Sequence, residues 1–465
     1  MSIAAVERRG AREALLLAPA LALAASGAFL LARTVPDIAG KPWHEDEAVA
    51  GLIAARPLGD LLHTVVLDRG GAPLHFLLAH AAFALDGSPR TLRWLSLLFA
   101  LATIPACYDL ARRLAGQFAG LTAAALAATS QLLTIHATFG RMYSLFAFAS
   151  ALSLDLFVRA LDRPSRGTLA TATAAAVLPL AIHPFGVFVF AAEALIAVWR
   201  WRFRAIPALV LAAPFVLPYL RLTGRYAPDV GMPASEATLR AVGGAAGGYG
   251  VTLAVFGTLA VVGAWSLRRT FTALGLLVLA APPAMLATLT ADKLSPRHLI
   301  FVLPVWTTFV AAGLSRLPRR LAVTSVALAV AVLAPAAVVD PRTSSADATT
   351  AAAWVREHVR GGDALYPYSP VFLAALPQAS VARALPREPV ALARMLGRTN
   401  GIRRTLVAIP HARSWSILAV RGPFANVPRA LAHVAPGLHG LARAAVLQLY
   451  ATSTEGTSPQ RSSRR

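Results

Sequence analysis

The sequence is poor in cysteine and in acidic residues. Its 465 residues include one cysteine, Cys107, inside an apolar stretch, which excludes a framework of internal disulfides. Only 22 residues are Asp or Glu, against 44 Lys and Arg, so the formal net charge is +22. Hydrophobic residues make up 57% of the chain, and the mean hydropathy is +0.60. This composition excludes an ordinary soluble domain and indicates a polytopic membrane protein.

Several catalytic signatures are also missing. The chain has no Walker-type phosphate loop, no Rossmann glycine fingerprint, no Cys/His metal spacing and no serine nucleophile elbow. It therefore lacks the motifs of nucleotide hydrolysis and redox chemistry. The energy for any transfer reaction must then come from the substrate itself. Richness in Ala, Arg and Gly suggests a bacterial coding sequence of high GC content.

About eleven stretches are apolar and long enough to cross a membrane as helices. The first, Leu15 to Ala32, follows three arginines, and we expect an uncleaved helix there; the alternative is a cleaved signal peptide. The other predicted spans are 91–111, 117–137, 143–161, 168–182, 184–199, 205–220, 248–266, 271–290, 298–315 and 321–338.

The arginines lie in the short connections between these spans, which argues against a nucleic-acid partner. A further apolar piece, 73–85, is short for a crossing and suits an interfacial helix. If it does not cross and the N-terminus is cytoplasmic, every basic joint lies inside, as the positive-inside rule predicts. The basic joints are Arg112 and Arg113; Arg163 and Arg166; Arg200, Arg202 and Arg204; Arg268 and Arg269; and Arg316, Arg319 and Arg320.

This topology predicts a mainly α protein, a transmembrane helical bundle over residues 1–339 with an outer first loop at 34–90. Residues 340–451 lose the long apolar runs and show one helical and two strand-like patterns, typical of a small α/β domain, which would lie outside the cytoplasm. The polar tail 452–465 is predicted to be disordered. We expect a multi-pass protein of the cell membrane.

The outer first loop contains an acidic cluster. Glu45, Asp46 and Glu47 follow one another, and adjacent carboxylates repel, which suits a general base or a cation site. The alternative is a solvated acidic turn. With few acidic residues in the chain, a cluster at the mouth of the bundle favours catalysis. We expect His44, Glu45 and His75, from the same loop, to lie on the acceptor side.

Basic residues that the topology places outside are candidates for phosphate binding. Arg141 and Tyr143 lie in one turn, and Lys293, Arg297 and His298 precede a later span. Arginine matches phosphate oxygens with a planar fork of donors, and lysine adds a point charge. Snorkelling to lipid headgroups is the alternative. Arg221 and Arg225, in another outer loop, strengthen the prediction of a phosphate-bearing ligand.

Three further residues in or beside the spans carry ionisable side chains. His183 lies at a Pro-Gly turn between two spans, where it would contact a phosphate or cap a helix. Glu193 lies within a span, where a carboxylate costs about 2.5 to 3.5 kcal/mol unless it is paired, and its sequence neighbours suggest no partner. Asp155 is predicted to pair with Arg159 one turn later.

In this order, the motifs resemble those of GT-C membrane glycosyltransferases, in the branch of the protein O-mannosyltransferases and lipid A aminoarabinose transferases. The resemblance covers about residues 12–338. Asp46 and the segment from Ala72 match an outer acid followed by a helix beginning Pro-Pro-Leu, although Ala72 replaces one proline. Arg141 and Tyr143 match an Arg-x-Tyr turn. Residues 296–298 match a Pro-Arg-Tyr element, with His298 in place of the aromatic residue.

The resemblance implies a sugar donor linked to polyprenyl phosphate and a lipid, glycan or protein acceptor. Asp46 would take the acceptor's proton, with Glu47 in reserve, and Arg297, Lys293 and Arg141 would hold the donor phosphate. Some relatives use a divalent cation that bridges to a second acid in the Arg-x-Tyr turn. That turn has no carboxylate here, so we expect no metal or other cofactor. The alternatives are a lipid-linked-glycan transporter and a non-catalytic lipid-binding assembly protein.

Overall fold

The computed structural model describes residues 3–40, 44–68, 72–207, 210, 214, 233–246, 248–288, 296–336, 349–358, 363–366, 371, 374, 404–410, 415–421 and 450–451. The chain divides into two compact units. Unit 1 comprises Met1–Ala39, Gly70–His75 and Arg93–Asp340, and unit 2 comprises Gly40–Arg69, Phe76–Leu92 and Pro341–Arg465.

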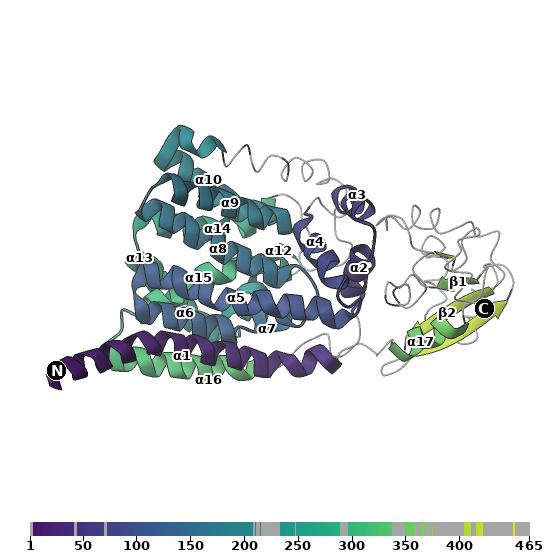
Figure 1. The fold of residues 1–465 in the computed structure, drawn as a ribbon, viewed down its shortest axis with the longest axis horizontal. Helices are drawn as coiled ribbons and strands as arrows, with labels where there is room; N and C mark the ends of the chain where they lie inside the picture. Colours follow the sequence, from purple (N-terminus) through teal and green to yellow (C-terminus); the bar gives the residue numbers. More distant parts are fainter. Residues whose placement is uncertain are drawn as a thin grey trace. The chain divides into compact units, whose positions relative to one another are not determined.

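The described residues before 340 are mainly helical (Figure 1). The α-helices and two 3₁₀ helices are α1 (Ile3–Gly40), α2 (Glu45–Ala54), α3 (Leu58–Asp68), α4 (Leu74–Phe83), α5 (Pro89–Ala115), α6 (Gln117–Thr129), α7 (Gln131–Ala137), α8 (Tyr143–Asp162), α9 (Arg166–Ile182), α10 (Gly186–Trp201), η1 (Arg202–Ala205), α12 (Ala234–Ala246), α13 (Val251–Ser266), α14 (Arg269–Thr288), η2 (Pro296–Val302), α15 (Leu303–Leu314), α16 (Arg319–Ala336) and α17 (Thr349–His358).

Within the described residues, four helical segments are long and apolar enough to cross a membrane. They are Ala18–Ile38, Arg90–Ala115, Tyr143–Asp162 and Pro296–Leu314. The helices at the predicted spans 168–182 and 248–266 are apolar but shorter, and most of 205–220 lies outside the described residues. The chain is therefore a mainly helical, multi-pass membrane protein.

The predicted span 117–137 is not one straight helix. It divides into α6 and α7, which meet at an angle of 57°. Ser130 has an extended backbone, with φ of −65° and ψ of 124°, so the helix stops there without a proline. The hydroxyl and the backbone N–H of Thr134 both donate to the Ser130 carbonyl, at 2.9 and 3.0 Å, so α7 begins directly after the break. If the pair counts as one span, the number of candidate crossings rises to five.

Close backbone packing of α13 on α15 is central to the bundle. A Cβ atom on Gly263 would lie 1.8 Å from the Phe309 carbonyl oxygen, and one on Gly313 would lie 2.0 Å from the Leu259 carbonyl oxygen. No side chain fits at either point, so glycine is required where the two helices cross. The neighbouring pairs α8 with α9, α6 with α15 and α9 with α10 complete the packing of unit 1.

Ion pairs join the helices at one end of unit 1. Asp155, buried in α8, accepts from Arg113 of α5 at 3.2 Å and from Arg159 at 2.6 Å, so the predicted local pair is confirmed. Arg268, between α13 and α14, pairs with Asp162 at the end of α8. We call this the arginine end.

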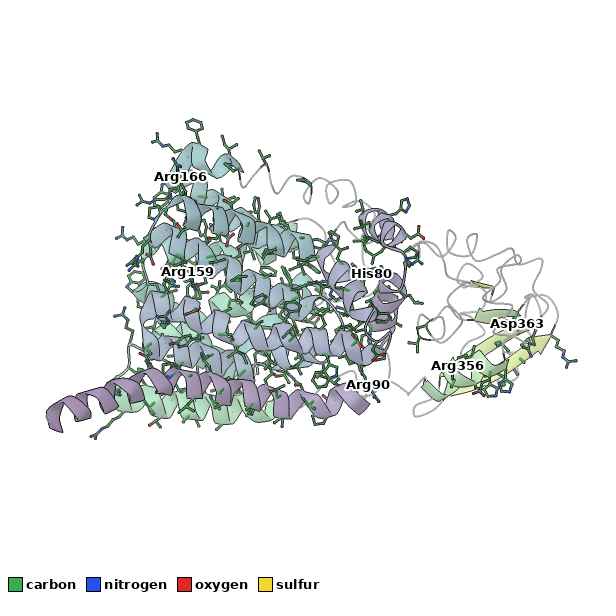
Figure 2. The ribbon with its side chains drawn as sticks, viewed as in Figure 1. His80, Arg90, Arg159, Arg166, Arg356 and Asp363 are labelled. Carbon is green, nitrogen blue, oxygen red and sulfur yellow. The ribbon has the colours of Figure 1, made fainter. Side chains whose placement is uncertain are left out.

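The arginine end contains several of the predicted basic joints. In Figure 2, Arg159 and Arg166, on either side of the α8–α9 connection, lie at the end of the bundle where α1 begins. Arg316 donates to the Ser266 carbonyl at 2.9 Å, so the α15–α16 and α13–α14 connections meet. Segregation of arginine to one end of a bundle is the pattern expected of a membrane protein.

The intramembrane carboxyl group of Glu193 has a partner that its sequence neighbours did not reveal. The Ser153 hydroxyl of α8 lies 2.8 Å from Oε1 and 2.9 Å from Oε2 of Glu193 in α10. Both residues are buried. The contact joins α10 to α8 by a polar interaction, which reduces the cost of burying the carboxyl group.

The C-terminal region forms a four-stranded sheet in the order β3-β2-β1-β4. The strands are β1 (Asp363–Tyr366), β2 (Arg404–Pro410), β3 (Trp415–Arg421) and β4 (Tyr450–Ala451). β1 pairs parallel with β2, and the other two pairings are antiparallel. Arg404 of β2 forms an ion pair with buried Asp363 of β1 across the parallel pairing. The predicted helix and two strands are present, whereas β3 and β4 were not predicted.

We predict that Gly263→Ala destabilises the protein by at least about 2 kcal/mol, because the added methyl group would overlap the backbone of α15. Gly257→Ala, in the same helix, is the matched control, since nothing lies within 4 Å of its added Cβ atom. The control should be neutral or stabilising. Thermal unfolding in detergent compares the two variants, and equal melting temperatures would contradict the backbone contact.

Candidate active site

Several turns of unit 1 meet at the end opposite the arginine end. The turn between α7 and α8 carries Arg141, the turn between α9 and α10 carries His183, and η2 carries Arg297 and His298. The hydroxyl of Ser96, from the first half of α5, donates to the Phe139 carbonyl at 2.7 Å and to the Arg141 carbonyl at 3.2 Å. This pair of bonds fixes the α7–α8 turn against α5. We call this end the histidine end.

Tyr143 lies at the centre of the histidine end. The Arg297 guanidinium carbon lies 5.6 Å from the centre of the Tyr143 ring, within the range of a cation–π interaction. The ring centres of His183 and His298 are each 6.1 Å from that of Tyr143. His136, from the end of α7, is nearer, at 4.8 Å. Tyr143 is buried, so its ring serves as a fixed platform for Arg297.

The turn around His183 has a defined geometry. Nδ1 of His183 accepts a hydrogen bond from the Phe185 backbone N–H at 3.1 Å. A Cβ atom on Gly186 would lie 2.2 Å from the Pro179 backbone, so only glycine allows α9 and α10 to approach so closely. Burial, together with the nearby charges of His298, Arg141 and Arg297, holds the pKa of His183 well below its ordinary value. His183 is therefore neutral near pH 7.

His75, at the beginning of α4, is also neutral. It is buried, and burial together with the positive charge of Arg141 lowers its pKa to about 3. The positive charge of Arg141 thus acts on both His75 and His183. Arg141, Tyr143, His183, Arg297 and His298 thus come together as a site, with His75 in electrostatic contact, although they are far apart in the sequence.

The acidic cluster belongs to unit 2 and begins a helix; it is not a solvated turn. His44 is the N-cap of α2, and its Nδ1 accepts from the Asp46 N–H at 3.1 Å. In return, Glu47 accepts from the His44 N–H at 3.0 Å, which completes a capping box. Glu47 is buried, whereas Asp46 is only partly buried. Because Glu47 has this structural role, Asp46 is the better candidate base. The helix N-terminus also stabilises the negative charge of the cluster.

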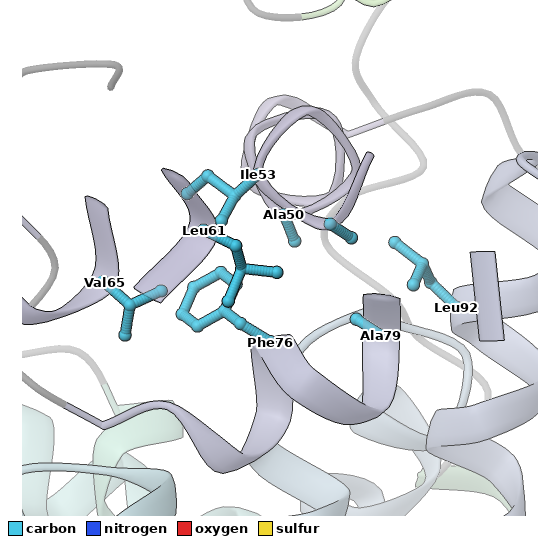
Figure 3. Close-up of a cluster of buried hydrophobic side chains, with 8 residues drawn as sticks. Ala50, Ile53, Leu61, Val65, Phe76, Ala79 and Leu92 are labelled. Atoms are coloured by element: carbon cyan, nitrogen blue, oxygen red, sulfur yellow. The ribbon is translucent and has the colours of Figure 1, made fainter. Parts of the chain in front are cut away.

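A hydrophobic cluster within unit 2 holds together α2, which carries Asp46, and the two short helices that follow it. Figure 3 shows side chains from α2, α3, α4 and the start of α5 in mutual contact. His80 of α4 is hydrogen bonded through Nδ1 to the Ala54 carbonyl of α2 at 2.7 Å. The cluster gives the N-terminus of α2 a rigid support. Its buried members are Ala50, Ile53, Ala54, Leu61, Val65, Phe76, Ala79 and Leu92.

The remaining predicted site residues lie elsewhere. Lys293, Arg221 and Arg225 lie outside the described residues, as does the Glu45 side chain. Among the described side chains, no three His, Cys, Asp or Glu residues converge as metal ligands, and Glu47 is engaged in its capping box.

Sequence reasoning missed His136, Phe139 and Phe185. The Phe139 ring stacks on Tyr143 with centres 6.2 Å apart, and the Phe185 ring meets His298 edge-on at 5.6 Å. Phe139 and Phe185 are ordinary aromatic residues in or beside apolar runs, so pattern alone gives no reason to select them. The one available signal was His136, a lone histidine within the predicted span 117–137.

The fold is shared with solved membrane glycosyltransferases. ArnT from Cupriavidus metallidurans bound to undecaprenyl phosphate matches with a TM-score of 0.57 and 13% identity, over 84% of this chain and 92% of that chain. An Archaeoglobus fulgidus oligosaccharyltransferase in complex with Zn and sulfate matches with a TM-score of 0.50 and 12% identity, over 83% of this chain and 68% of that chain.

The apo structure of the Cupriavidus protein aligns over 61% of its length, with a TM-score of 0.49. No protein-family model matches this sequence, and no curated protein matches it. ArnT, a lipid A aminoarabinose transferase, and the oligosaccharyltransferase are both GT-C proteins, so the predicted GT-C resemblance is confirmed for the fold.

We predict that the folded protein loses stability as the pH falls from 6.5 toward 3, in part through His75. The unfolded chain takes up a proton on this histidine below its ordinary pKa of 6.5, whereas the folded chain does so only near 3. The difference is about 2 kcal/mol between pH 7.5 and pH 5. His75→Asn should reduce the pH dependence of chemical unfolding by that amount. A variant of exposed His63 is the control, and unchanged pH dependence in His75→Asn would contradict the assignment.

Proposed function

We propose that this protein is an integral-membrane glycosyltransferase that moves a sugar from a polyprenyl-phosphate donor to an acceptor outside the cytoplasm. The observation that carries the proposal is the position of Arg297 over Tyr143, with the Arg141 charge beside it, at the end of the bundle opposite the arginine end. Two guanidinium groups suit a lipid phosphate at the membrane surface. The fold shared with ArnT, whose structure holds undecaprenyl phosphate, supports the choice of ligand.

We further propose a topology of eleven crossings, with the arginine end and the N-terminus in the cytoplasm. α1 crosses outward, α2 to α4 stay outside, and α5 crosses back. The histidine end, the first-loop helices and the C-terminal sheet then all face the extracytoplasmic side. The ion pairs among the ends of α5, α8 and α13 support one cytoplasmic end for these helices.

In the proposed reaction, Asp46 removes the proton from an acceptor hydroxyl as its oxygen attacks the anomeric carbon of the sugar. The bond from that carbon to the phosphate oxygen breaks, and the electron pair leaves with the polyprenyl phosphate, so the anomeric configuration inverts. Arg297 and Arg141 stabilise the negative charge that grows on the departing phosphate, with Lys293 as a further cation. The donor supplies the energy, and no step needs a metal.

A lipid-linked-glycan transporter is the second candidate, favoured by the broken span at Ser130 and by buried Glu193. A transporter would move a glycan without changing its covalent bonds. Purified protein that forms a glycosylated acceptor and releases polyprenyl phosphate would therefore decide for the transferase.

We predict that Asp46→Asn lowers the rate of sugar transfer by at least about 100-fold, because the amide does not accept the proton. The fold should persist, since the Asp46 backbone N–H still caps α2. The assay uses radiolabelled polyprenyl-phosphate mannose, glucose and arabinose, and Asp60→Asn in the first turn of α3 is the matched control. Normal turnover by Asp46→Asn would refute its role as base.

We predict that Arg297→Ala weakens the binding of polyprenyl phosphate by about 10- to 100-fold, the effect of losing a charged hydrogen-bond donor. Arg297→Lys should fall between the variant and the wild type, because it restores the charge but not the planar fork. Arg319→Ala, at the arginine end, controls for a general loss of positive charge. Unchanged affinity in Arg297→Ala, measured by direct binding, would move the phosphate site elsewhere.

A further inference from the structure

The hydrogen bonds of His183 define which of its ring nitrogens carries a proton. A neutral imidazole has one N–H group, and Nδ1 of His183 accepts from the Phe185 N–H. The proton must therefore be on Nε2. No hydrogen bond within the described part of the chain uses Nε2, although 6% of the residue's surface remains exposed. His183 thus offers one neutral donor from a nearly buried position.

The surroundings of this donor are both aromatic and cationic. The Phe146 ring stacks on His183 with centres 5.1 Å apart, and the Phe185 ring meets it edge-on at 5.3 Å. His298, partly exposed, lies 5.3 Å away. The charges of Arg141 and Arg297 act on His183, so the Nε2–H group of His183 lies next to the proposed phosphate site without adding charge to it.

The two arginines and the neutral His183 suit different parts of the headgroup of a polyprenyl-phosphate sugar. A phosphate gains most from cationic donors, which Arg141 and Arg297 provide. A sugar presents neutral hydroxyl and ring oxygens together with apolar C–H faces. A neutral N–H on an imidazole that packs against two aromatic rings matches that mixture, in the way that ligand pockets combine apolar walls with a few placed polar groups. The sugar is attached directly to the phosphate, so it would occupy the space beside the two arginines.

We infer that His183 binds the sugar of the donor, by donating its Nε2–H to a sugar oxygen, and leaves the phosphate to the arginines. The inference rests on the proposed function, and it replaces the phosphate contact that the sequence suggested for His183. In this interpretation His183 recognises the sugar through Nε2, and the hydrogen bond from the Phe185 N–H to Nδ1 holds its ring in place.

Two substitutions separate the sugar contact from the structural role of the ring. In His183→Asn, the side-chain oxygen can still accept from the Phe185 N–H, but no donor reaches the Nε2 position. In His183→Gln, the longer amide places an N–H near that position. Both variants lose the stacking on Phe146, and His183→Gln also loses the bond from the Phe185 N–H, so a purely structural effect would leave the Gln variant no better than the Asn variant.

The experiment measures the affinity of wild type, His183→Asn and His183→Gln for two kinds of probe in detergent. One is sugar-free polyprenyl phosphate, and the other is a set of polyprenyl-phosphate glycosides of mannose, glucose and arabinose. We expect His183→Asn to weaken binding of the glycoside that is the true donor by about 3- to 10-fold, the effect of one neutral hydrogen bond. Its affinity for sugar-free polyprenyl phosphate should not change, and His183→Gln should recover most of the loss.

The other outcomes overturn the inference. Equal weakening for both kinds of probe would mean that His183 contacts the phosphate, and equal loss in Asn and Gln variants would mean a structural role. No change in either variant would mean no contact. Failure of the proposed function would appear differently, because the wild-type protein would then either bind neither kind of probe or, as a transporter, bind the glycosides without forming a glycosylated acceptor.

Discussion

The stacking of Arg297 on Tyr143 is the interaction on which the site depends. Tyr143 is buried and its ring contacts His136 and Phe139, so the guanidinium group lies over a fixed ring at the end of the bundle. A membrane confines charged groups to its two surfaces. At the arginine end, the charges of Arg113, Arg159 and Arg268 are paired with aspartates. At the histidine end, Arg297 lies over the Tyr143 ring, and the charges of Arg297 and Arg141 act on buried His183. We propose that this end binds an anionic ligand.

The positive charge gathered at the histidine end also bears on why His75 and His183 are neutral. Cationic imidazoles would add to the charge of Arg141 and Arg297, and burial prevents this in His75 and His183. Neutral rings instead supply directed hydrogen bonds, as the Phe185 contact shows. The proposed base lies in a different unit, at the capped N-terminus of α2, where the packing of Figure 3 supports it. Positioned donors, acceptors and charges of this kind are what a group transfer without a cofactor requires.

The sequence predicted a mainly helical, multi-pass membrane protein, because apolar run length and arginine position follow directly from the bilayer. The sequence also pointed to Tyr143 and Arg297. Their turns carry arginine on the outer side of the membrane, where the positive-inside rule makes arginine uncommon. It did not predict the break at Ser130, where no proline marks the end of the helix, nor Ser153 as the partner of Glu193, because that contact joins residues far apart in the chain. The roles of His136 and Glu47 likewise depend on contacts that a linear pattern does not contain.

The central claim is that Asp46 and Arg297 serve one headgroup. Cysteine cross-linking tests it directly, because the one native cysteine, Cys107, is buried and gives little background. Cysteines placed at positions 46 and 297 should react together with a short bifunctional reagent, and bound polyprenyl phosphate should block the reaction. A pair at positions 162 and 268, whose native side chains are exposed to solvent and form an ion pair, is the positive control. A positive control that cross-links while the 46–297 pair never does would contradict the account.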